Sequence, residues 1–345
     1  MDFSRRELIK ASVGVLGWRG AASAQTHDPL PSWNPGPPKQ SILDFIHQTT
    51  DKNSSKYVEP QDRIAAFDQD GTLWVEHPIY SQVLFSYDRV AALASQHPEW
   101  KTTEPFRAVL TRDKPAMEKF TLKDIETIVM ATQAGMTTDA FQKIVNDWMA
   151  TAKHPRFNKP FPEMVYQPML EVMRYLRANG YRTYIVTRGG QDFVRAYAQP
   201  VYGMPPENII GSALQTRYTY NDQDHGVLIR EPKLLLDNNF SGKAEDIYLF
   251  LGKHPRVAFG NSTGDRQMLE YTQAGGGARL MQLVLHDDAK REYAYGPAQG
   301  LPDTRVGTFS QALYDEAMAN GWSVISMKND WRFIFGGEAT SSSRA

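Results

Sequence analysis

The chain has 345 residues, with 38 basic and 39 acidic side chains, a formal net charge of −1 and no cysteine. This balance gives no electrostatic reason to expect a nucleic acid or an anionic membrane surface as a partner, and the lack of cysteine excludes disulfides and thiolate metal sites. With 41% hydrophobic residues, the chain is long enough for one large domain and a smaller one.

The N-terminus has the features of an export signal. Arg5 and Arg6 form a twin-arginine pattern, followed by a mildly apolar stretch at 11–17 and an alanine-rich cleavage pattern that ends at Ala24. The apolar stretch is too short to span a bilayer. We therefore predict a twin-arginine signal peptide over residues 1–24, recognised by the twin-arginine export machinery. The mature bacterial protein is then periplasmic or secreted, with no stable membrane anchor.

The most informative motif is DxDGT at residues 68–72, directly after the apolar run 64–67. The run predicts a buried strand, and Gly71 allows a tight turn at its end. Asp68 and Asp70 are two residues apart, so on a strand their side chains point the same way. Two carboxylates aimed at one point need a cation or a shared proton, and oxygen donors suit Mg²⁺. A solvated acidic turn is the alternative for a bare DxD motif.

A long insertion separates this motif from the next strand-terminal polar residue. Over a hundred residues follow Asp70 before that position, too many for a simple crossover. Thr121 and Asp124 match a capping box that opens a helix, and apolar residues recur at helical spacing from Phe141 to Met149. These patterns predict a helical insertion.

A second unit follows, with helical spacing at 166–179 and an apolar strand at 181–186. Helix followed by strand is typical of a doubly wound α/β fold. Thr187 ends this strand and precedes Arg188 and two glycines, and a hydroxyl with accessible backbone N–H groups can hold a phosphate. Arg188 is a further candidate for binding phosphate. An ordinary loop remains the alternative for this short pattern.

The remaining polar candidates lie near the ends of later elements. Lys243 begins a predicted helix, although most lysines are surface residues. The apolar run 256–259 predicts a strand, and the Gly-rich turn after it places Asn261 and Asp265 at the carboxyl edge of the sheet, unless they serve turn chemistry only. A hairpin at 209–236 and strands at 280–285 and 322–327 complete the predicted elements.

Together these motifs, in this order over about residues 60–290, resemble the haloacid dehalogenase superfamily of phosphotransfer enzymes. The resemblance implies a doubly wound, Rossmann-like parallel sheet with an inserted helical cap. It divides the chain into signal peptide 1–24, linker 25–40, core 41–79 and 162–335, cap 80–161 and flexible tail 336–345. Phosphoserine phosphatases and exported phosphorylcholine phosphatases are similar in layout.

The resemblance also implies roles for the candidate residues. Asp68 matches the nucleophile and Asp70 the general acid/base. Thr187, Arg188 and Lys243 would bind phosphate, and Asp68, Asp70, Asn261 and Asp265 would hold Mg²⁺. Many members carry aspartate where this chain has Asn261, so the metal site has one negative charge fewer, and Asn261→Asp is expected to tighten metal binding.

The implied function is Mg²⁺-dependent hydrolysis of a small phosphomonoester through an aspartyl-phosphate. One alternative is an exported protein that binds a phospho-ligand without catalysis, motivated by Asn261. A second is a serine esterase, because Ser262 lies in a G-x-S-x-G pattern with His286 as the only later histidine. Glu76 and His77 could line the pocket entrance or simply pack, and His286 could contact the substrate. The motifs leave the particular phosphate ester open.

Overall fold

The fold is described by a computed structural model that covers residues 28–337, so the predicted signal peptide and all but the first two residues of the predicted tail lie outside the described residues. One seven-stranded sheet has the order β4-β3-β2-β1-β5-β6-β7. Its strands are β1 (Ile64–Phe67), β2 (Arg182–Gly190), β3 (Ile209–Tyr220), β4 (Gly226–Leu236), β5 (Val257–Gly260), β6 (Leu280–Leu285) and β7 (Ser323–Ser326). Neighbouring strands are parallel except for the antiparallel pair β3 and β4.

The predicted doubly wound α/β fold is confirmed. The chain runs outward from β1 through β2 and β3, and then returns to β5 on the other side of β1. The strand order therefore reverses between β1 and β5, which is where open α/β sheets place their ligand sites. Both strands are buried along their whole length, and the rings of Phe67 and Phe259 stack across them at 5.0 Å.

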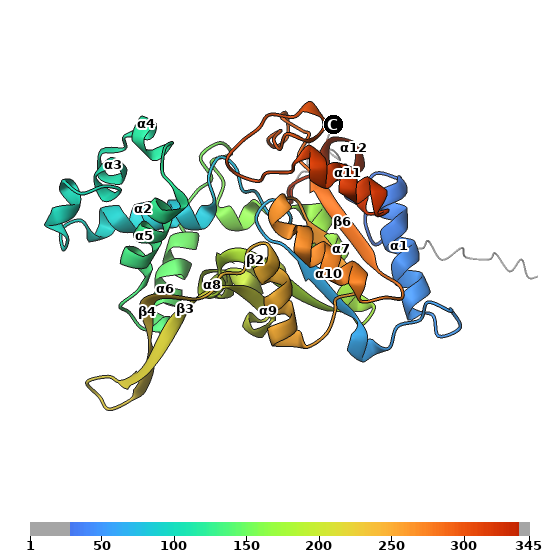
Figure 1. Ribbon diagram of the computed structural model, residues 1–345, viewed down its shortest axis with the longest axis horizontal. Coiled ribbons are helices and arrows are strands. Elements are labelled where there is room, and N and C mark those ends of the chain that lie inside the picture. Colours follow the sequence, from blue (N-terminus) through green and yellow to red (C-terminus); the bar gives the residue numbers. More distant parts are fainter. Residues whose placement is uncertain (1–27, 338–345) are drawn as a thin grey trace, which may run out of the picture.

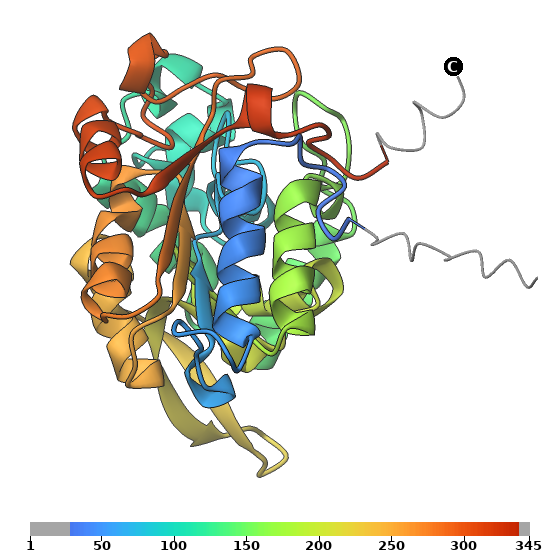
Figure 2. The ribbon, with the colours of Figure 1, turned by 90° about the vertical axis from the view of Figure 1, so that its right-hand side faces the viewer.

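Helices cover both faces of the sheet. Helices α1 (Pro37–Thr50), α7 (Gln167–Ala178) and α8 (Gln191–Tyr202) share one apolar core, to which β1 contributes Ala65 and Phe67. Helices α9 (Ser241–Leu251), α10 (Arg266–Ala274) and α11 (Gln311–Ala319) share another, to which β1 contributes Ile64 and Ala66. Alternate residues of one strand thus enter different cores, as the pleat requires. Figure 2 shows α1 and α7 on one face of the sheet.

The predicted linker at 25–40 is wrong for its described part. Leu30 and Trp33 are buried in the main core, and the Trp33 ring meets the edge of Trp331 at 6.0 Å. Helix α1 begins at Pro37, within the stretch that its proline content suggested was a spacer. Proline is common in the first turn of a helix, because the N–H that it lacks has no partner there.

Between β1 and β2 the chain forms a helical lobe, seen on the left of Figure 1. It contains α2 (Ser81–Leu93), α3 (Phe106–Thr111), α4 (Lys114–Met117), α5 (Leu122–Gln133) and α6 (Thr138–Met149). The capping box of Thr121 and Asp124 is present at the start of α5. Part of the lobe has a small core of its own around Trp100 and Ile128, whereas Phe141 of α6 belongs to the main core. Helix α6 therefore joins the lobe to the body.

The remaining elements are short or project from the body. The hairpin of β3 and β4 was predicted, and its far end projects from the body (Figure 1). Helix α12 (Met327–Asp330) follows β7. Among the described helices, none combines the length and apolar character that a bilayer crossing demands. Single-turn 3₁₀ helices lie at Pro60–Asp62, Pro98–Lys101, Phe161–Glu163, Pro206–Asn208, Thr263–Asp265 and Ala298–Gly300.

Candidate active site

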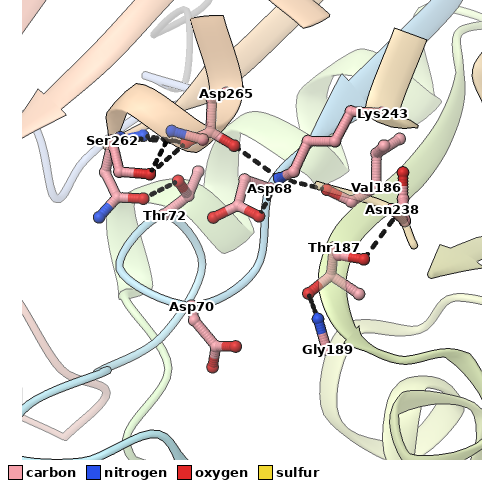
Figure 3. A network of polar contacts seen from close by, with 12 residues as sticks. Asp68, Asp70, Thr72, Val186, Thr187, Gly189, Asn238, Lys243, Ser262 and Asp265 are labelled. Carbon is pink, nitrogen blue, oxygen red and sulfur yellow. Dashed lines mark hydrogen bonds and ion pairs between the residues drawn. The ribbon is translucent and has the colours of Figure 1, made fainter. Parts of the chain in front are cut away.

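The site is built around a buried lysine at the strand-order reversal. The Lys243 Nζ lies 2.5 Å from Asp68 Oδ1, 2.5 Å from Asp265 Oδ1 and 2.8 Å from the Val186 carbonyl oxygen (Figure 3). An ammonium has three N–H donors, so all three are used. Asp68 follows β1, Asp265 follows β5, and Lys243 comes from α9, so three separate elements meet at one point. The surface alternative for Lys243 is excluded, because its side chain is 2% exposed.

Gly242 explains how Lys243 reaches this point. A Cβ at position 242 would lie 2.0 Å from the Asp237 carbonyl oxygen. A side chain at 242 would thus force the start of α9 away from the preceding loop. The glycine permits the close approach that directs Lys243 inward.

The cluster is short of positive charge. Burial, with the charge of Asp265, raises the pKa of Asp68 to about 8, although Lys243 opposes the rise. Burial by itself would lower the pKa of Lys243, but the two carboxylates outweigh it and raise the pKa. We take Lys243 as charged, since its three hydrogen bonds all go to oxygen acceptors. One ammonium then faces two buried carboxylates, and the electrostatics suit an additional cation beside Asp68.

Asp265 shapes the turn that follows β5. Its Oδ2 accepts from the backbone N–H groups of Asn261 and Ser262, both at 3.0 Å, while its Oδ1 is bound to Lys243. Both of its oxygens are therefore committed within the described residues. Ser262 caps this turn, and its Oγ accepts from the Gly264 N–H at 3.2 Å. Position 262 is structural in this geometry.

His286 also has a structural position. One ring nitrogen lies 2.7 Å from the Gly71 carbonyl oxygen, and the other lies 3.1 Å from Glu292 Oε2. Both nitrogens are occupied away from Ser262, so the described residues do not assemble a serine-histidine pair. His286 and Glu292 instead hold the turn after β1. The structure gives the serine esterase alternative no support, and His286 is buried at 2% exposure.

Asp70 does not face the same point as Asp68. Its Oδ1 accepts from Trp74 Nε1 at 2.7 Å, and Figure 3 shows its carboxyl group pointing away from the lysine cluster. The expectation fails because β1 ends at Phe67, so both residues lie in the turn, where strand alternation does not apply. Burial raises the pKa of Asp70 to about 6, against the effect of the Trp74 hydrogen bond. A carboxyl group of this kind suits proton transfer near neutral pH.

The irregular end of β2 lies near Asp70. The sequence predicted that this strand ends at Thr187, but β2 continues to Gly190, with a shift of its pairing register between Thr187 and Gly190. This stretch is called the Thr187 loop below. A Cβ built on Gly189 would lie 3.2 Å from Thr187 Oγ1, 3.6 Å from Gln82 Oε1 and 3.8 Å from Asp70 Oδ2. The Thr187 hydroxyl accepts from the Gly189 N–H at 3.0 Å, and the Gly190 N–H donates to Gln82 Oε1 at 2.7 Å. The Thr187 hydroxyl thus lies beside the acid, whereas the Gly189 and Gly190 N–H groups already have partners. Phosphate binding by Thr187 stays a prediction.

Arg188 differs from its neighbour, because it is exposed whereas Thr187 is buried. Its charge acts on Tyr80 at the start of the helical lobe. Burial raises the pKa of the Tyr80 phenol well above its ordinary value, Glu76 adds to the rise, and Arg188 opposes it. Arg188 thus belongs to the rim between the core and the lobe.

Sequence reasoning missed several residues at this site. Gln82 contacts the Thr187 loop from α2, and Tyr295 donates to Glu76 Oε1 at 2.7 Å. Glu292 holds His286 from a loop after β6. None lies in a recognisable motif, and only the fold brings them to the site. Glu76 is buried at 2% exposure and lies beside Asn261 rather than at an open entrance.

The oxygen atoms near Asp68 are of the kind that binds Mg²⁺, although the side chains around it do not form a cluster of acidic residues. Over residues 28–337, no three histidine, aspartate or glutamate side chains are grouped so as to hold a metal ion. Asp265 is neutralised by Lys243, and Asp70 points away. The second oxygen of Asp68 points toward Thr72 in Figure 3, and Thr72 donates to Asn261 Oδ1 at 3.2 Å. The Asp68 and Asn261 oxygens are hard donors and fit Mg²⁺ in chemical type.

Fold and site together place the buried Asp68 carboxylate at the strand-order reversal, where open α/β sheets bind their ligands. Residues 65–270 match the family model of haloacid dehalogenase-like hydrolases. The chain belongs to this family of hydrolases. A search of curated proteins found no match.

Solved structures resemble the chain distantly. A conserved functionally unknown protein from Anaerococcus prevotii has 15% identity and a TM-score of 0.49, with 72% of this chain and 86% of that chain covered. A protein with unknown function from Bordetella pertussis has 15% identity and a TM-score of 0.47, with coverage of 76% and 98%. A phosphoserine phosphohydrolase-like protein from Francisella tularensis has 16% identity and a TM-score of 0.34, with coverage of 65% and 88%. At these levels none bears on activity.

Proposed function

We propose that this hydrolase is an exported, Mg²⁺-dependent phosphomonoester phosphatase that acts through an aspartyl-phosphate at Asp68. The observation that carries the proposal is the Asp68 carboxylate, buried and bonded to Lys243 at the strand-order reversal, with Asp70 and the Thr187 loop beside it. A nucleophile, a proton donor with a pKa of about 6 and phosphate-binding donors are thus supplied by one edge of the sheet.

The reaction has two steps, and Asp70 gives a proton in the first and takes one in the second. An Asp68 oxygen forms a bond to phosphorus, the bond from phosphorus to the ester oxygen breaks, and Asp70 gives its proton to the departing alkoxide. Water then attacks the phosphorus of the acyl phosphate, Asp70 takes a proton from the water, and the bond to Asp68 breaks to release phosphate. The Thr187 hydroxyl would donate to the phosphoryl oxygens, and Lys243, whose three N–H donors are already used, would stabilise them through its positive charge.

Asp68 and Asn261 would hold the metal ion, with Asp265 orienting the turn and held by Lys243. When bound, Mg²⁺ supplies positive charge between an anionic substrate and an anionic nucleophile. The sequence assigned Asp70 and Asp265 to this set as well. We now propose structural or proton-transfer roles for those two side chains.

Chelation tests both the activity and the metal. The protein should hydrolyse p-nitrophenyl phosphate, lose nearly all activity in excess EDTA and recover it when Mg²⁺ is added beyond the chelator, since Lys243 alone does not balance the charge at Asp68. Initial rates measured across a Mg²⁺ titration check this. Full turnover in excess chelator would exclude the metal mechanism, and phosphate binding without turnover would favour the non-catalytic alternative.

The substrate is proposed to be a small phosphorylated metabolite whose leaving group meets the helical lobe. Gln82 of the lobe accepts a hydrogen bond from the Gly190 N–H of the Thr187 loop. Gln82→Ala should therefore change kcat/KM for some phosphorylated metabolites by about tenfold relative to others. The change in kcat/KM for p-nitrophenyl phosphate should be smaller. Exposed Gln96 of the same lobe gives the control Gln96→Ala. Equal effects on all esters would assign specificity to the core loops.

Export is part of the proposal and is supported by Arg5, Arg6 and the cleavage pattern at Ala24. The periplasm or the extracellular medium is then the working location, and the twin-arginine machinery is the transient partner. Cell fractionation of the full-length protein decides this point, and retention in the cytoplasm would contradict it.

A further inference from the structure

Behind Asn261 lies a buried carboxyl group that the catalytic steps do not use. Asn261 Nδ2 donates to Glu76 Oε1 at 2.7 Å, and the Tyr295 hydroxyl donates to the same oxygen, also at 2.7 Å. On the other side of the amide, Thr72 Oγ1 donates to Asn261 Oδ1 at 3.2 Å. The side chains form a chain of donors and acceptors that runs from Tyr295 through Glu76 and Asn261 to Thr72.

This chain fixes which end of the amide faces the site. If the Asn261 amide were turned over, its oxygen would face the Glu76 oxygen, and its N–H₂ would face Thr72. That arrangement places two acceptors against each other in a buried place, which is costly. In the observed orientation, the Asn261 amide oxygen faces Thr72. One oxygen of Asp68 points toward Thr72 as well (Figure 3).

Glu76 itself has little freedom to move. A Cβ on Gly71 would lie 2.3 Å from Glu76 Oε1, and one on Gly307 would lie 2.0 Å from the same atom. Both glycines have positive φ, at 76° and 67°, so two tight turns close over the carboxyl group. The acceptor behind Asn261 is therefore held in place by backbone, and only glycine fits at these two positions.

We propose that Glu76 is a positioning residue that holds the Asn261 amide with its oxygen toward the metal side. The proposal rests on the proposed metal-dependent function. It also explains why asparagine suits this position, because an aspartate at 261 would set a carboxylate against Glu76. Asn261→Asp is expected from the sequence alone to tighten metal binding, and the contact with Glu76 reverses that expectation.

Four variants test the proposal through Mn²⁺ binding, measured by electron paramagnetic resonance at pH 8 with no substrate present. Glu76→Ala removes the acceptor and should weaken Mn²⁺ binding by about 10- to 100-fold. Glu76→Gln keeps an oxygen for Tyr295 and Asn261 and should bind nearly as the wild type. Asn261→Asp alone should weaken binding. In the double variant, the amide introduced by Glu76→Gln can donate to the new carboxylate, so binding should recover.

The outcomes separate the possibilities. Exposed Glu163→Ala serves as the control and should bind Mn²⁺ as the wild type does. Equal losses in Glu76→Gln and Glu76→Ala would show that charge, not orientation, matters, and would overturn the proposal. Asn261→Asp that tightens binding equally in both backgrounds would also overturn it, because the two positions would then act independently.

A second measurement is made without metal and therefore also tests variants that do not bind Mn²⁺. In urea unfolding of the metal-free protein, Asn261→Asp should lower the midpoint more in the wild-type background than in the Glu76→Gln background. Additive effects would overturn the orientation proposal. A wild type that shows this coupling but neither binds Mn²⁺ nor hydrolyses phosphate esters would instead refute the proposed function.

Discussion

Asp68→Asn should reduce phosphatase turnover by at least about 1,000-fold while leaving the fold intact, because an amide cannot form the aspartyl-phosphate. The substitution is nearly isosteric and keeps an oxygen toward Lys243, which donates to Asp68 Oδ1 at 2.5 Å. Rates with p-nitrophenyl phosphate at saturating Mg²⁺, together with circular dichroism, provide the measurement.

The raised pKa of Asp68, about 8, adds a prediction for stability. An acid whose pKa is higher in the folded than in the unfolded state destabilises the fold as pH rises from the unfolded to the folded pKa, here from 3.8 to about 8. The amide introduced by Asp68→Asn carries no charge to desolvate, so the metal-free variant should unfold at a temperature no lower than the wild type at pH 8. A lower unfolding temperature would show that Lys243 offsets the burial cost fully.

Ser262→Ala is the matched control for the nucleophile. It should keep activity and lose only the turn cap, a loss of about 1 kcal/mol. Substantial turnover in Asp68→Asn with normal circular dichroism would end the nucleophile assignment. An inactive Ser262→Ala protein that is folded would restore the esterase alternative.

Lys243→Met should have the largest effect on stability. The Lys243 side chain is 2% exposed, and its ammonium is shared by Asp68 and Asp265. Its removal therefore leaves two buried carboxyl groups without a cation. Breaking a buried ion pair in this way typically costs about 3–5 kcal/mol in the free energy of unfolding. Urea unfolding at pH 8 measures it, and turnover should be lost as well.

The effect should be smaller at acidic pH. The pKa of Asp68 is raised by burial and by Asp265, and loss of Lys243 removes the group that opposes this rise. Asp68 therefore takes up a proton as pH falls, and its repulsion with Asp265 then disappears. Lys253→Met is the control: Lys253 contacts Asp62 at 2.6 Å, but its side chain is 44% exposed. An exposed pair of this kind contributes less than about 1 kcal/mol. Equal losses for the two lysines would contradict a buried ion-pair cluster around Lys243.

The sequence by itself determined the fold class and pointed to candidate residues, of which the fold brings Asp68, Lys243 and Asp265 together. Short apolar runs before Asp68 and Asn261 predicted buried strands, because strands covered on both faces carry few polar residues. Thr187, Lys243 and Asp265 were each predicted as site candidates from a position near the end of a strand or the start of a helix. Local signals of this kind survive folding, since they depend on neighbours in the chain.

The tertiary structure alone decided how the charges are shared. The direction of Asp70 depends on where β1 ends and on Trp74. The orientation of the Asn261 amide depends on Glu76, a contact across 185 positions of sequence. Gln82 and Tyr295 reach the site through packing that no local pattern encodes. Hydrogen-bond partners of buried polar groups are set by the assembled fold, because each group must find its partner among whatever the packing brings near.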